Sequence, residues 1–305
     1  MNRFNARRSV VQMLALAGMV VSSAAGSANA ALITEFVAYG KESVSIGVGS
    51  SITGLVGSGS GGVGSVGMNG GAGVFGDVRS ANTITLANNC FITGNAFNPG
   101  SFSTGSGATI GSHTVGMPDL PVFPSASVYS GGVTNSTVAN GGTINLLPGS
   151  YNTVSLGGAA TLNLSSGDYY INSLSSGNGL DLNINITGGV DCRVFVTGAA
   201  SFGSVDVFMT GGDARDVFVE THAAGNNAFK AGGSSHWVGN VFTPNGEIHI
   251  GSGSSSGDSV GYLWAGTEVD IEHGIKVSNP FVPAPGAVVV VGLAGAMGFA
   301  RRRRG

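Results

Sequence analysis

Charged residues are scarce in this chain. Asp, Glu, Lys and Arg make up only 10% of its 305 residues, where about 25% is usual. The 13 basic and 16 acidic residues leave a formal net charge of −3, so the chain lacks the cationic surplus that nucleic-acid binding requires. Hydrophobic residues make up 42%, which is too many for ordinary disorder. We therefore expect a folded protein with no nucleic-acid partner.

Long hydrophobic runs are also missing, since no run reaches the about 20 residues of a stable transmembrane helix. A shorter run over residues 10–21 follows three positive charges, Arg3, Arg7 and Arg8, and precedes a small-x-small site formed by Ala28, Asn29 and Ala30. This order is typical of a secretory signal peptide over residues 1–30 that is cleaved before Ala31. The Arg7–Arg8 pair leaves both general and twin-arginine export open.

The C-terminal residues 279–305 have a more specific arrangement. The motif Val282-Pro283-Ala284-Pro285-Gly286 precedes an uncharged run over residues 287–300, and Arg301, Arg302, Arg303 and Arg304 follow it. The run predicts a short transmembrane helix, and the arginines place its end in the cytoplasm. A plain C-terminal membrane anchor would have the same hydropathy, so that alternative stays open.

The order of motif, apolar helix and arginine cluster resembles the PEP-CTERM sorting signal of Gram-negative bacteria. This chain has Pro283-Ala284-Pro285 where that family has Pro-Glu-Pro. The resemblance implies that a membrane-embedded exosortase cuts at the motif and releases or anchors the protein outside the cell. Before the cut, the C-terminal helix would hold the protein transiently in the inner membrane.

Glycine is abundant, with 54 residues, and it accompanies an internal repeat. Residues 65–76, 83–94 and 101–112 align at 18-residue steps, which superimpose Val66, Ile84 and Phe102. Val74, Ile92 and Ile110 align in the same way, and one step back gives Val48 and Val56. Small and larger apolar residues alternate two positions apart, which is typical of short strands separated by turns. We predict a β-solenoid, in which each coil buries its inward side chains by stacking on its neighbours.

Three prolines interrupt the repeat, and we expect a loop over residues 118–142. Wider coils of about 20–22 residues follow over 143–278, because Ile248 and Ile250 recur as Val269 and Ile271. We predict an all-β, right-handed parallel β-helix in which the coils of residues 31–117 and 143–278 stack in chain order, about 12 in number. One strand is expected to run from Trp237 to Val241.

The segments TITLANNCFITG and LLPGSYNTVSLGGAATLNLSSGDYYINSL are similar to bacterial β-helix proteins of the bactofilin-like, polymer-forming type. The resemblance rests on the residue pattern of the repeats and not on an invariant motif. It implies a right-handed β-helix and a structural role, and it transfers no catalytic residue to this chain.

The two cysteines, Cys90 and Cys192, are predicted to be core residues. In an exported protein they could form a disulfide. A stack in chain order separates them by about five coils, or roughly 24 Å, whereas a disulfide needs Cα atoms within about 7 Å. Cys90 aligns with Ala72 and Ala108 at a small inward position.

The densest polar cluster joins residues of two coils. A 21-residue coil stacks Glu247 on Glu268 and His249 on Asp270, on the face opposite Ile248 and Ile250; Glu272 and His273 follow nearby. Such groups could bind a metal ion. Because their spacing matches no dense ligand motif, we expect a solvated polar face, with no metal and no cofactor.

Cleavage of polysaccharide needs convergent carboxylates, or a base beside cationic residues. The candidate acids are Asp191, Asp206, Asp213 and Asp216, and the nearby cations are Arg193, Arg215 and Lys230. Five aromatic residues could stack on sugars, although in such strands they more often stack between coils; they are Tyr169, Tyr170, Trp237, Tyr262 and Trp264. We expect no catalytic residue among these candidates.

The sequence therefore predicts a non-enzymatic structural protein of the cell surface or extracellular matrix. Its expected partners are the export machinery, an exosortase-type enzyme and, as a candidate, extracellular polysaccharide. Two alternatives stay open. One is a β-helix that binds or cleaves polysaccharide, and the other is a self-assembling filament, because solenoid ends are unpaired strand edges.

Overall fold

The computed structural model describes residues 33–60, 62–253 and 256–279. These residues form an all-β, right-handed-type solenoid of about 11 turns. Their only helical elements are two short 3-10 turns, η1 (Ile33–Glu35) and η2 (Ala214–Asp216). Within this part of the chain no helix is long and apolar enough to cross a membrane. The expected signal peptide and C-terminal helix lie outside the described residues.

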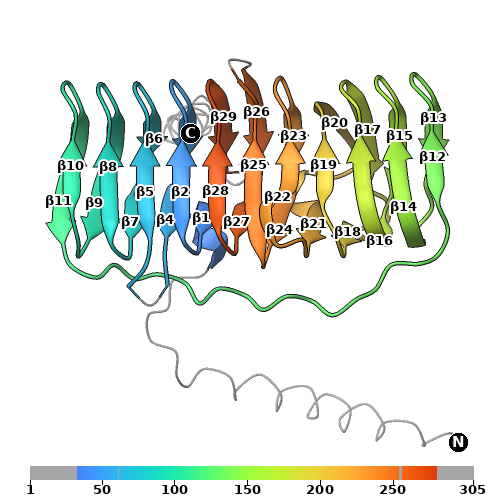
Figure 1. Ribbon diagram of the computed structural model, residues 1–305, viewed down its shortest axis with the longest axis horizontal. Coiled ribbons are helices and arrows are strands. Elements are labelled where there is room, and N and C mark those ends of the chain that lie inside the picture. Colours follow the sequence, from blue (N-terminus) through green and yellow to red (C-terminus); the bar gives the residue numbers. More distant parts are fainter. Residues whose placement is uncertain (1–32, 61, 254–255, 280–305) are drawn as a thin grey trace, which may run out of the picture. The chain divides into compact units, whose positions relative to one another are not determined.

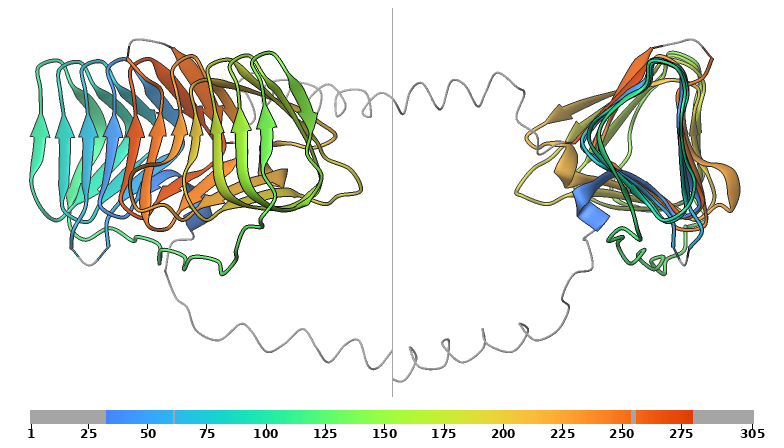
Figure 2. Two further views of the ribbon diagram at one scale, coloured as in Figure 1. Left: turned by 45° about the vertical axis from the view of Figure 1, so that its right-hand side comes forward. Right: turned by 90° about the vertical axis from the view of Figure 1, so that its left-hand side faces the viewer.

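Each turn contributes to three faces, and the strands are parallel along every face (Figure 1; Figure 2, right, shows the triangular outline of the coils). In order along the solenoid, face A consists of β10 (Phe102–Thr104), β8 (Thr83–Leu86), β5 (Ser65–Met68), β2 (Ser43–Ile46), β28 (Glu268–Ile271), β25 (Gly246–Ile250), β22 (Gly225–Ala231), β19 (Ala200–Phe202), the second part of β16 (Gly167–Ser176), the second part of β14 (Gly149–Leu156) and β12 (Ser136–Val138).

Faces B and C follow the same order. Face B consists of the first parts of β11 (Thr109–Val115) and β9 (Phe91–Asn98), then β6 (Gly73–Phe75), β3 (Ser51–Thr53), β29 (Ile275–Ser278), β26 (Gly257–Val260), β23 (His236–Val238), β20 (Val205–Thr210), β17 (Leu180–Asn185), β15 (Thr161–Ser165) and β13 (Thr143–Asn145). Face C consists of the second parts of β11 and β9, then β7 (Val78–Ser80), β4 (Leu55–Ser58), β1 (Phe36–Gly40), β27 (Leu263–Ala265), β24 (Asn240–Thr243), β21 (Val217–Thr221), β18 (Cys192–Val196) and the first parts of β16 and β14.

The coils do not stack in chain order, and our expectation on this point was wrong. The first strands, β1, β2 and β3, pair with the last strands, β27, β28 and β29. The chain therefore starts in the middle of the solenoid and runs to the end formed by β10 and β11. It then crosses the outside of the solenoid through residues 116–135 and returns from the end formed by β12 and β13 (Figure 1). We call residues 116–135 the crossing segment.

We call the boundary between the first and last coils the seam. We call adjacent paired strands of a face rungs, and the rungs at the seam are hydrogen-bonded like the others. Gly47 N donates to Ile271 O at 2.6 Å, Lys41 N to Ala265 O at 2.9 Å and Gly274 N to Val48 O at 3.0 Å. A parallel strand edge presents the same row of donors and acceptors to any partner of the right length. The last coil can therefore complete the stack against the first coil, because the crossing segment has carried the chain to the far end.

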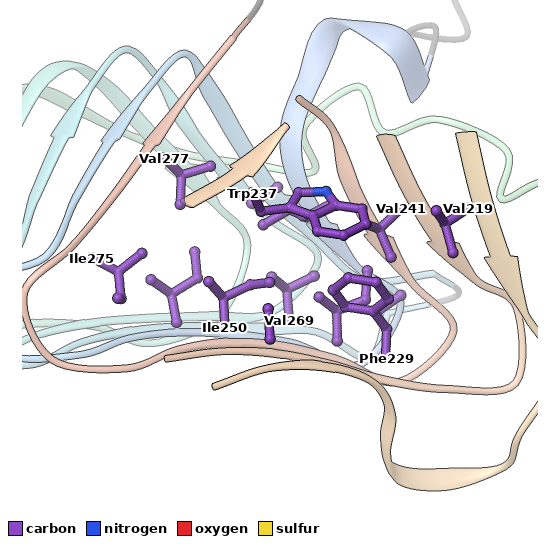
Figure 3. Packing of buried hydrophobic residues seen from close by; sticks show 14 of the residues in the cluster. Val219, Phe229, Trp237, Val241, Ile250, Val269, Ile275 and Val277 are labelled. Carbon is purple, nitrogen blue, oxygen red and sulfur yellow. The ribbon is translucent and has the colours of Figure 1, made fainter. Parts of the chain in front are cut away.

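One continuous apolar core fills the triangle. Inward side chains alternate with outward ones along each strand, as the pattern of β5 and β8 shows. Figure 3 shows part of this core, in which Trp237 and Phe229 pack edge to face with ring centroids 4.8 Å apart. Both cysteines are fully buried and free, as predicted. Burial raises the pKa of the Cys192 thiol to about 12, which keeps it protonated and inert.

The 18-residue register is confirmed from Val66 onward but fails one step earlier. Val66 pairs with Ile84, and Ile84 pairs with Phe102. On its other side Val66 pairs with Val44 and not Val48, which is 47% exposed. The preceding corner contains additional residues, closed by a bridge between Ser60 and Val63, and this insertion shifts the register.

In the wider coils the expected strands are found with some corrections. Ile248 pairs with Val269, as predicted, and the same wider spacing pairs Leu162 with Leu182. The strand expected from Trp237 to Val241 is instead two strands, β23 and β24, because the chain turns from face B to face C at Gly239, whose φ is 139°. Strand β12 falls inside the stretch expected to be a loop, and β19, β22 and β26 were not predicted.

Candidate functional site

A polar cluster on face A lies beside the seam. His249 of β25 pairs in register with Asp270 of β28 and with Lys230 of β22, and Asp270 pairs with Ser45 of the first coil. The stacking of His249 on Asp270 was predicted from the 21-residue spacing. The alternation of strands explains it, because Ile248 and Ile250 point into the core on either side of His249.

Three carboxylates surround the imidazole of His249. Its Nδ1 lies 3.2 Å from Asp270 Oδ2 and 3.4 Å from Glu247 Oε1, and its Nε2 lies 3.8 Å from Glu272 Oε1. The hydrogen bond to Asp270 is the main reason why the pKa of His249 is raised above its ordinary value. Partial burial raises the pKa of the neighbouring Glu268 carboxyl, and the charges of Asp270 and Glu247 add to this effect.

The donor atoms of Glu247, His249 and Asp270 lie within 4.8 Å of one another, which is close enough to share a divalent cation. However, Asp270 and Glu247 both approach the same nitrogen, Nδ1, and their charges favour the protonated imidazole. A metal would have to displace that proton. The arrangement is better suited to holding His249 as a cation between carboxylates, so the absence of a metal remains our prediction. His273 lies on the exposed turn after β28.

Face B carries a second column of charged groups over the same coils. His236 pairs in register with Asp206 on one side and Asp258 on the other, and Asp258 pairs with Lys276. The Nδ1 atom of His236 lies 2.5 Å from Asp258 Oδ1, and both side chains are half exposed. Alternating charges on adjacent rungs attract one another, so this column supports the register of the strands.

A buried carboxylate fastens the crossing segment to face C. Glu220 of β21 is 1% exposed and accepts two hydrogen bonds from Ser127, one from the backbone N and one from Oγ, both at 2.8 Å. His222 Nε2 lies 2.6 Å from the same carboxylate. The hydroxyl of Tyr129 donates to Val196 O at 3.0 Å. Burial, with the charge of Glu220, raises the pKa of Tyr129. We call these four side chains (Ser127, Tyr129, Glu220 and His222) the clasp.

The clasp contains serine, histidine and an acid, but in an order that does not activate a nucleophile. In a catalytic triad the imidazole lies between the hydroxyl and the carboxylate and removes the hydroxyl proton. Here the carboxylate lies between the other two, so Ser127 donates its proton to Glu220 and does not contact the base. Sequence reasoning missed this site. Its one local signal is an acid at the end of the apolar run Val217-Phe218-Val219.

An apolar cluster lies beside the clasp, outside the solenoid core. Phe36, Tyr39, Phe242, Tyr262 and Trp264 form it, and Leu120 and Phe123 of the crossing segment pack against it. Tyr39 donates to Gly59 O, and burial raises its pKa to about 12. A pocket of about 680 Å³ opens beside residues 117–123 and is also lined by Lys41 and Ala81. No residue of the face A cluster lines this pocket.

The predicted sugar-binding aromatics do not gather at one site. Tyr169 and Trp237 lie in the core, whereas Tyr262 and Trp264 stack on each other in the cluster that Leu120 and Phe123 contact. Tyr170 stacks on Phe195 with ring centroids 5.3 Å apart. These contacts between coils agree with the structural interpretation of the aromatic residues.

The candidate acids are likewise separated. Asp213 and Asp216 cap η2, where Asp213 also pairs with Arg215. Arg193 forms two bonds with Asp168, at 2.8 and 2.9 Å. Asp206 lies beside His236, Lys230 beside His249, and Asp191 on the exposed turn before β18. A polysaccharide-cleaving enzyme would bring acids from several coils together in an open groove with cationic neighbours. These four acids do not form such a group.

Comparison with known proteins gives structural likenesses only. No family model and no curated protein matches the chain. One similar solved structure is an ice-binding protein from an Antarctic Flavobacteriaceae bacterium, with a TM-score of 0.31 and 13% identity over 81% of this chain and 80% of that chain. Another is the DUF3494 domain of an ice-binding protein from Shewanella frigidimarina, with a TM-score of 0.35 and 14% identity over 84% of this chain and 100% of that chain. Neither likeness assigns a ligand to this chain.

Proposed function

We propose that this chain is a non-enzymatic structural protein, exported to the cell surface or extracellular matrix and sorted by an exosortase. The solenoid is the part that acts outside the cell. The terminal segments serve delivery, with a signal peptide removed before Ala31 and a sorting motif over residues 282–286. The C-terminal helix holds the protein in the inner membrane only until the motif is cut.

The clasp supports a structural role more than any other feature. Ser127, His222 and Glu220 are the residue types of a hydrolase, yet all three fasten the crossing segment to face C. Other reactive side chains have similar uses, since Arg193 pairs with Asp168 and Asp213 caps η2. Reactive groups that stabilise strands and segments are not available to bind a transition state.

Mass spectrometry of the mature protein from its native host tests the proposal. The expected chain begins at Ala31 and ends within or before residues 282–286, and it is recovered from the cell surface or the medium. Replacing Pro283 and Pro285 by alanine should leave the chain uncut in the membrane. Recovery of a mature surface protein that retains Arg304, in a host with an active exosortase, would contradict sorting and leave a plain anchor.

The hydroxyl groups of face A favour a second candidate function, the binding of extracellular polysaccharide. On one side of the charged cluster Thr85 and Ser103 lie on adjacent strands of one register column, in which Gly67, without a hydroxyl, separates them from Ser45. On the other side the column is Thr137, Ser155, Ser175 and Ser201. Parallel rungs space these groups by about 4.8 Å. A row of evenly spaced hydroxyls can donate to and accept from a repeating, hydroxylated ligand.

Binding assays with variants of this face test the second candidate. Ser155→Leu with Ser175→Leu should weaken retention on the host's exopolysaccharide, whereas Thr161→Leu on face B should not. Thermal hysteresis is measured with the same variants, because both structural neighbours are ice-binding proteins. If none of the variants changes retention or hysteresis, face A is not a ligand-binding surface.

A further inference from the structure

Both ends of the solenoid leave the apolar core partly uncovered. At one end Phe102 and Ile110 are only partly buried, although Ile84 and Ile92 in the next coil are 0% and 2% exposed. At the other end Val138 and Ile144 are partly buried, although their partners in the next coil, Leu156 and Leu162, are 3% and 2% exposed. Terminal repeats of solenoids usually carry a polar cap. Among the described residues neither of these coils has a capping helix; at the first end the His113 ring stacks on Phe102 with ring centroids 3.9 Å apart.

The two terminal coils match in size and corner geometry. Phe102 precedes Ile110 by the same number of residues as Ser136 precedes Ile144. In one corner Ala108 N donates to Gly105 O at 3.3 Å, and in the other Gly142 N donates to Ala139 O at 3.0 Å. The left-handed residue of each corner is glycine, with φ 72° at Gly107 and 69° at Gly141. One corner would therefore superimpose on the other by translation along the solenoid axis.

The terminal coils also lack the charges that usually protect strand edges. Residues 99–115 and 136–148 contain no Asp, Glu, Lys or Arg. The charged columns on faces A and B lie instead over the central coils. Natural proteins commonly place lysine, other charges or bulges on exposed edges to prevent pairing with another chain. The only titratable side chain in these two ranges is His113, which stacks on Phe102, and both free edges are in register with the sheets behind them.

We propose that the end formed by β10 and β11 pairs with the end formed by β12 and β13 of a second copy of this chain. All strands of each face are parallel, so translation of one copy along the axis presents β12 to the free edge of β10 with the correct polarity. The contact is head to tail. Because each copy keeps one free end, the assembly is open and grows as a filament.

The register assigns the junction contacts. If the second copy continues the stack, Phe102 meets Ser136, Thr104 meets Val138, and Ile110 meets Ile144. Large Phe102 lies over small Ser136, and the two isoleucines continue the inward apolar column of face B. Thr104 and Ser103 are exposed in the single chain, so substitutions there leave the core intact.

The test uses the full chain and two single substitutions, one at each end. Thr104→Lys places a charge against Val138 of the next copy, and Val138→Asp does the same from the other side. Each should raise the concentration for half-maximal assembly by more than about tenfold, because the junction would bury an unpaired charge. Thr85→Lys adds the same charge at an exposed outward position of β8, which pairs with Ser103 and lies away from the junction, so this control should leave assembly unchanged. Thermal unfolding confirms that each variant is folded.

The combinations distinguish the head-to-tail contact from other contacts. In an equimolar mixture of the two single variants both junctions are compatible, because one is the wild-type contact and the other places the introduced lysine against the introduced aspartate. Sedimentation velocity should therefore show that the mixture assembles at concentrations at which neither variant assembles alone. The variant that carries both Thr104→Lys and Val138→Asp should form filaments again. A wild-type chain that stays monomeric at high concentration overturns the proposal. Assembly that neither single variant weakens also overturns it, because the contact would then lie on another surface, the terminal segments included.

Discussion

The corner between faces A and B contains one residue with a left-handed backbone conformation. The third residue of this corner has φ 67° at Gly49, 71° at Gly71 and 72° at Gly107. Asn89 and Ala159 occupy the equivalent place with φ 58° and 53°. Only glycine adopts this region without steric cost, so the glycine content follows in part from the number of coils.

Gly71→Ala should lower the free energy of unfolding by about 1 kcal/mol, because alanine is disfavoured at positive φ. A Cβ on Gly71 would meet nothing within 4 Å, so the cost is conformational and not steric. Gly67→Ala is the matched control, since its Cβ also meets nothing within 4 Å but the residue lies in strand β5. Urea unfolding should show a loss only for the first variant. Equal effects would contradict the conformational explanation.

The charge on His249 makes stability depend on pH. Its pKa is raised in the folded chain mainly by the hydrogen bond to Asp270, and the charges of Asp270, Glu247 and Glu272 add to this effect, while burial opposes it. Lys230 is the cation that pairs with His249 on the adjacent strand. The stabilisation is therefore fully present below the unfolded pKa of about 6.5 and is lost as pH rises through the folded pKa. The raised pKa of Glu268 has the same effect on stability: the folded chain is stabilised while this carboxyl is protonated, and the stabilisation is lost as pH rises. This loss begins at a lower pH than the loss due to His249, because the unfolded pKa of a glutamate is lower than that of a histidine.

Chemical unfolding of the wild type should therefore show a lower free energy of unfolding at pH 8 than at pH 5.5. His249→Gln should reduce that difference, because glutamine cannot gain the proton. His273→Gln, on the exposed turn after β28, is the control and should keep the wild-type difference. An unchanged pH dependence in His249→Gln would show that other groups cause it.

Calorimetric titration with calcium and zinc should show no stoichiometric binding tighter than micromolar. The reason is that Asp270 and Glu247 both approach His249 Nδ1 and favour its protonated form. A metal ion would have to displace that proton. A tight one-to-one isotherm that is lost in both Asp270→Asn and His249→Gln would reverse this conclusion and establish a metal centre.

At the scale of the element, the local repeat determines strands and faces. The 18-residue spacing predicted the pairing of Val66 with Ile84 because inward residues of adjacent coils must stack for burial. The same spacing failed before Val66 because a corner can lengthen without changing the strands on either side. The split at Gly239 was missed for a related reason, since a corner that needs only one residue leaves no gap in the apolar pattern.

The clasp shows what local patterns do not predict. Ser127 and Glu220 are far apart in the chain, and neither belongs to a recognisable motif. Their contact exists because the crossing segment passes over β21, and that follows from the coil order. Long-range contacts of this kind have no periodic signal in a single sequence.

Glu220→Ala should lower the free energy of unfolding by about 2–3 kcal/mol, because it removes bonds to a buried charge and leaves the Ser127 N–H without its acceptor. Limited proteolysis should then cut within residues 116–135 faster than in the wild type. Asp168→Ala removes an exposed pair with Arg193 and should cost less than about 1 kcal/mol. Equal losses in the two variants would mean that the clasp does not hold the segment.

At the scale of the molecule, the seam decides the architecture. The last coil pairs with the first, so the edges of both are used internally, and the free edges of the described solenoid belong to β10, β11, β12 and β13. Sequence analysis predicted the solenoid but stacked its coils in chain order. No inward side chain distinguishes the two orders, because Val44 and Ile46 fit equally well against any coil with apolar residues at these places.

Cross-linking across the seam tests the coil order most directly. Ser51 and Lys276 pair in register on face B, and neighbouring rungs lie about 4.8 Å apart, within disulfide range. Ser51→Cys with Lys276→Cys should therefore form an intramolecular disulfide under mild oxidation. Ser51→Cys with Asp258→Cys, one rung further, should not. If the double variant of residues 51 and 276 stays reduced while the chain is folded, the coils stack in chain order and the seam does not exist.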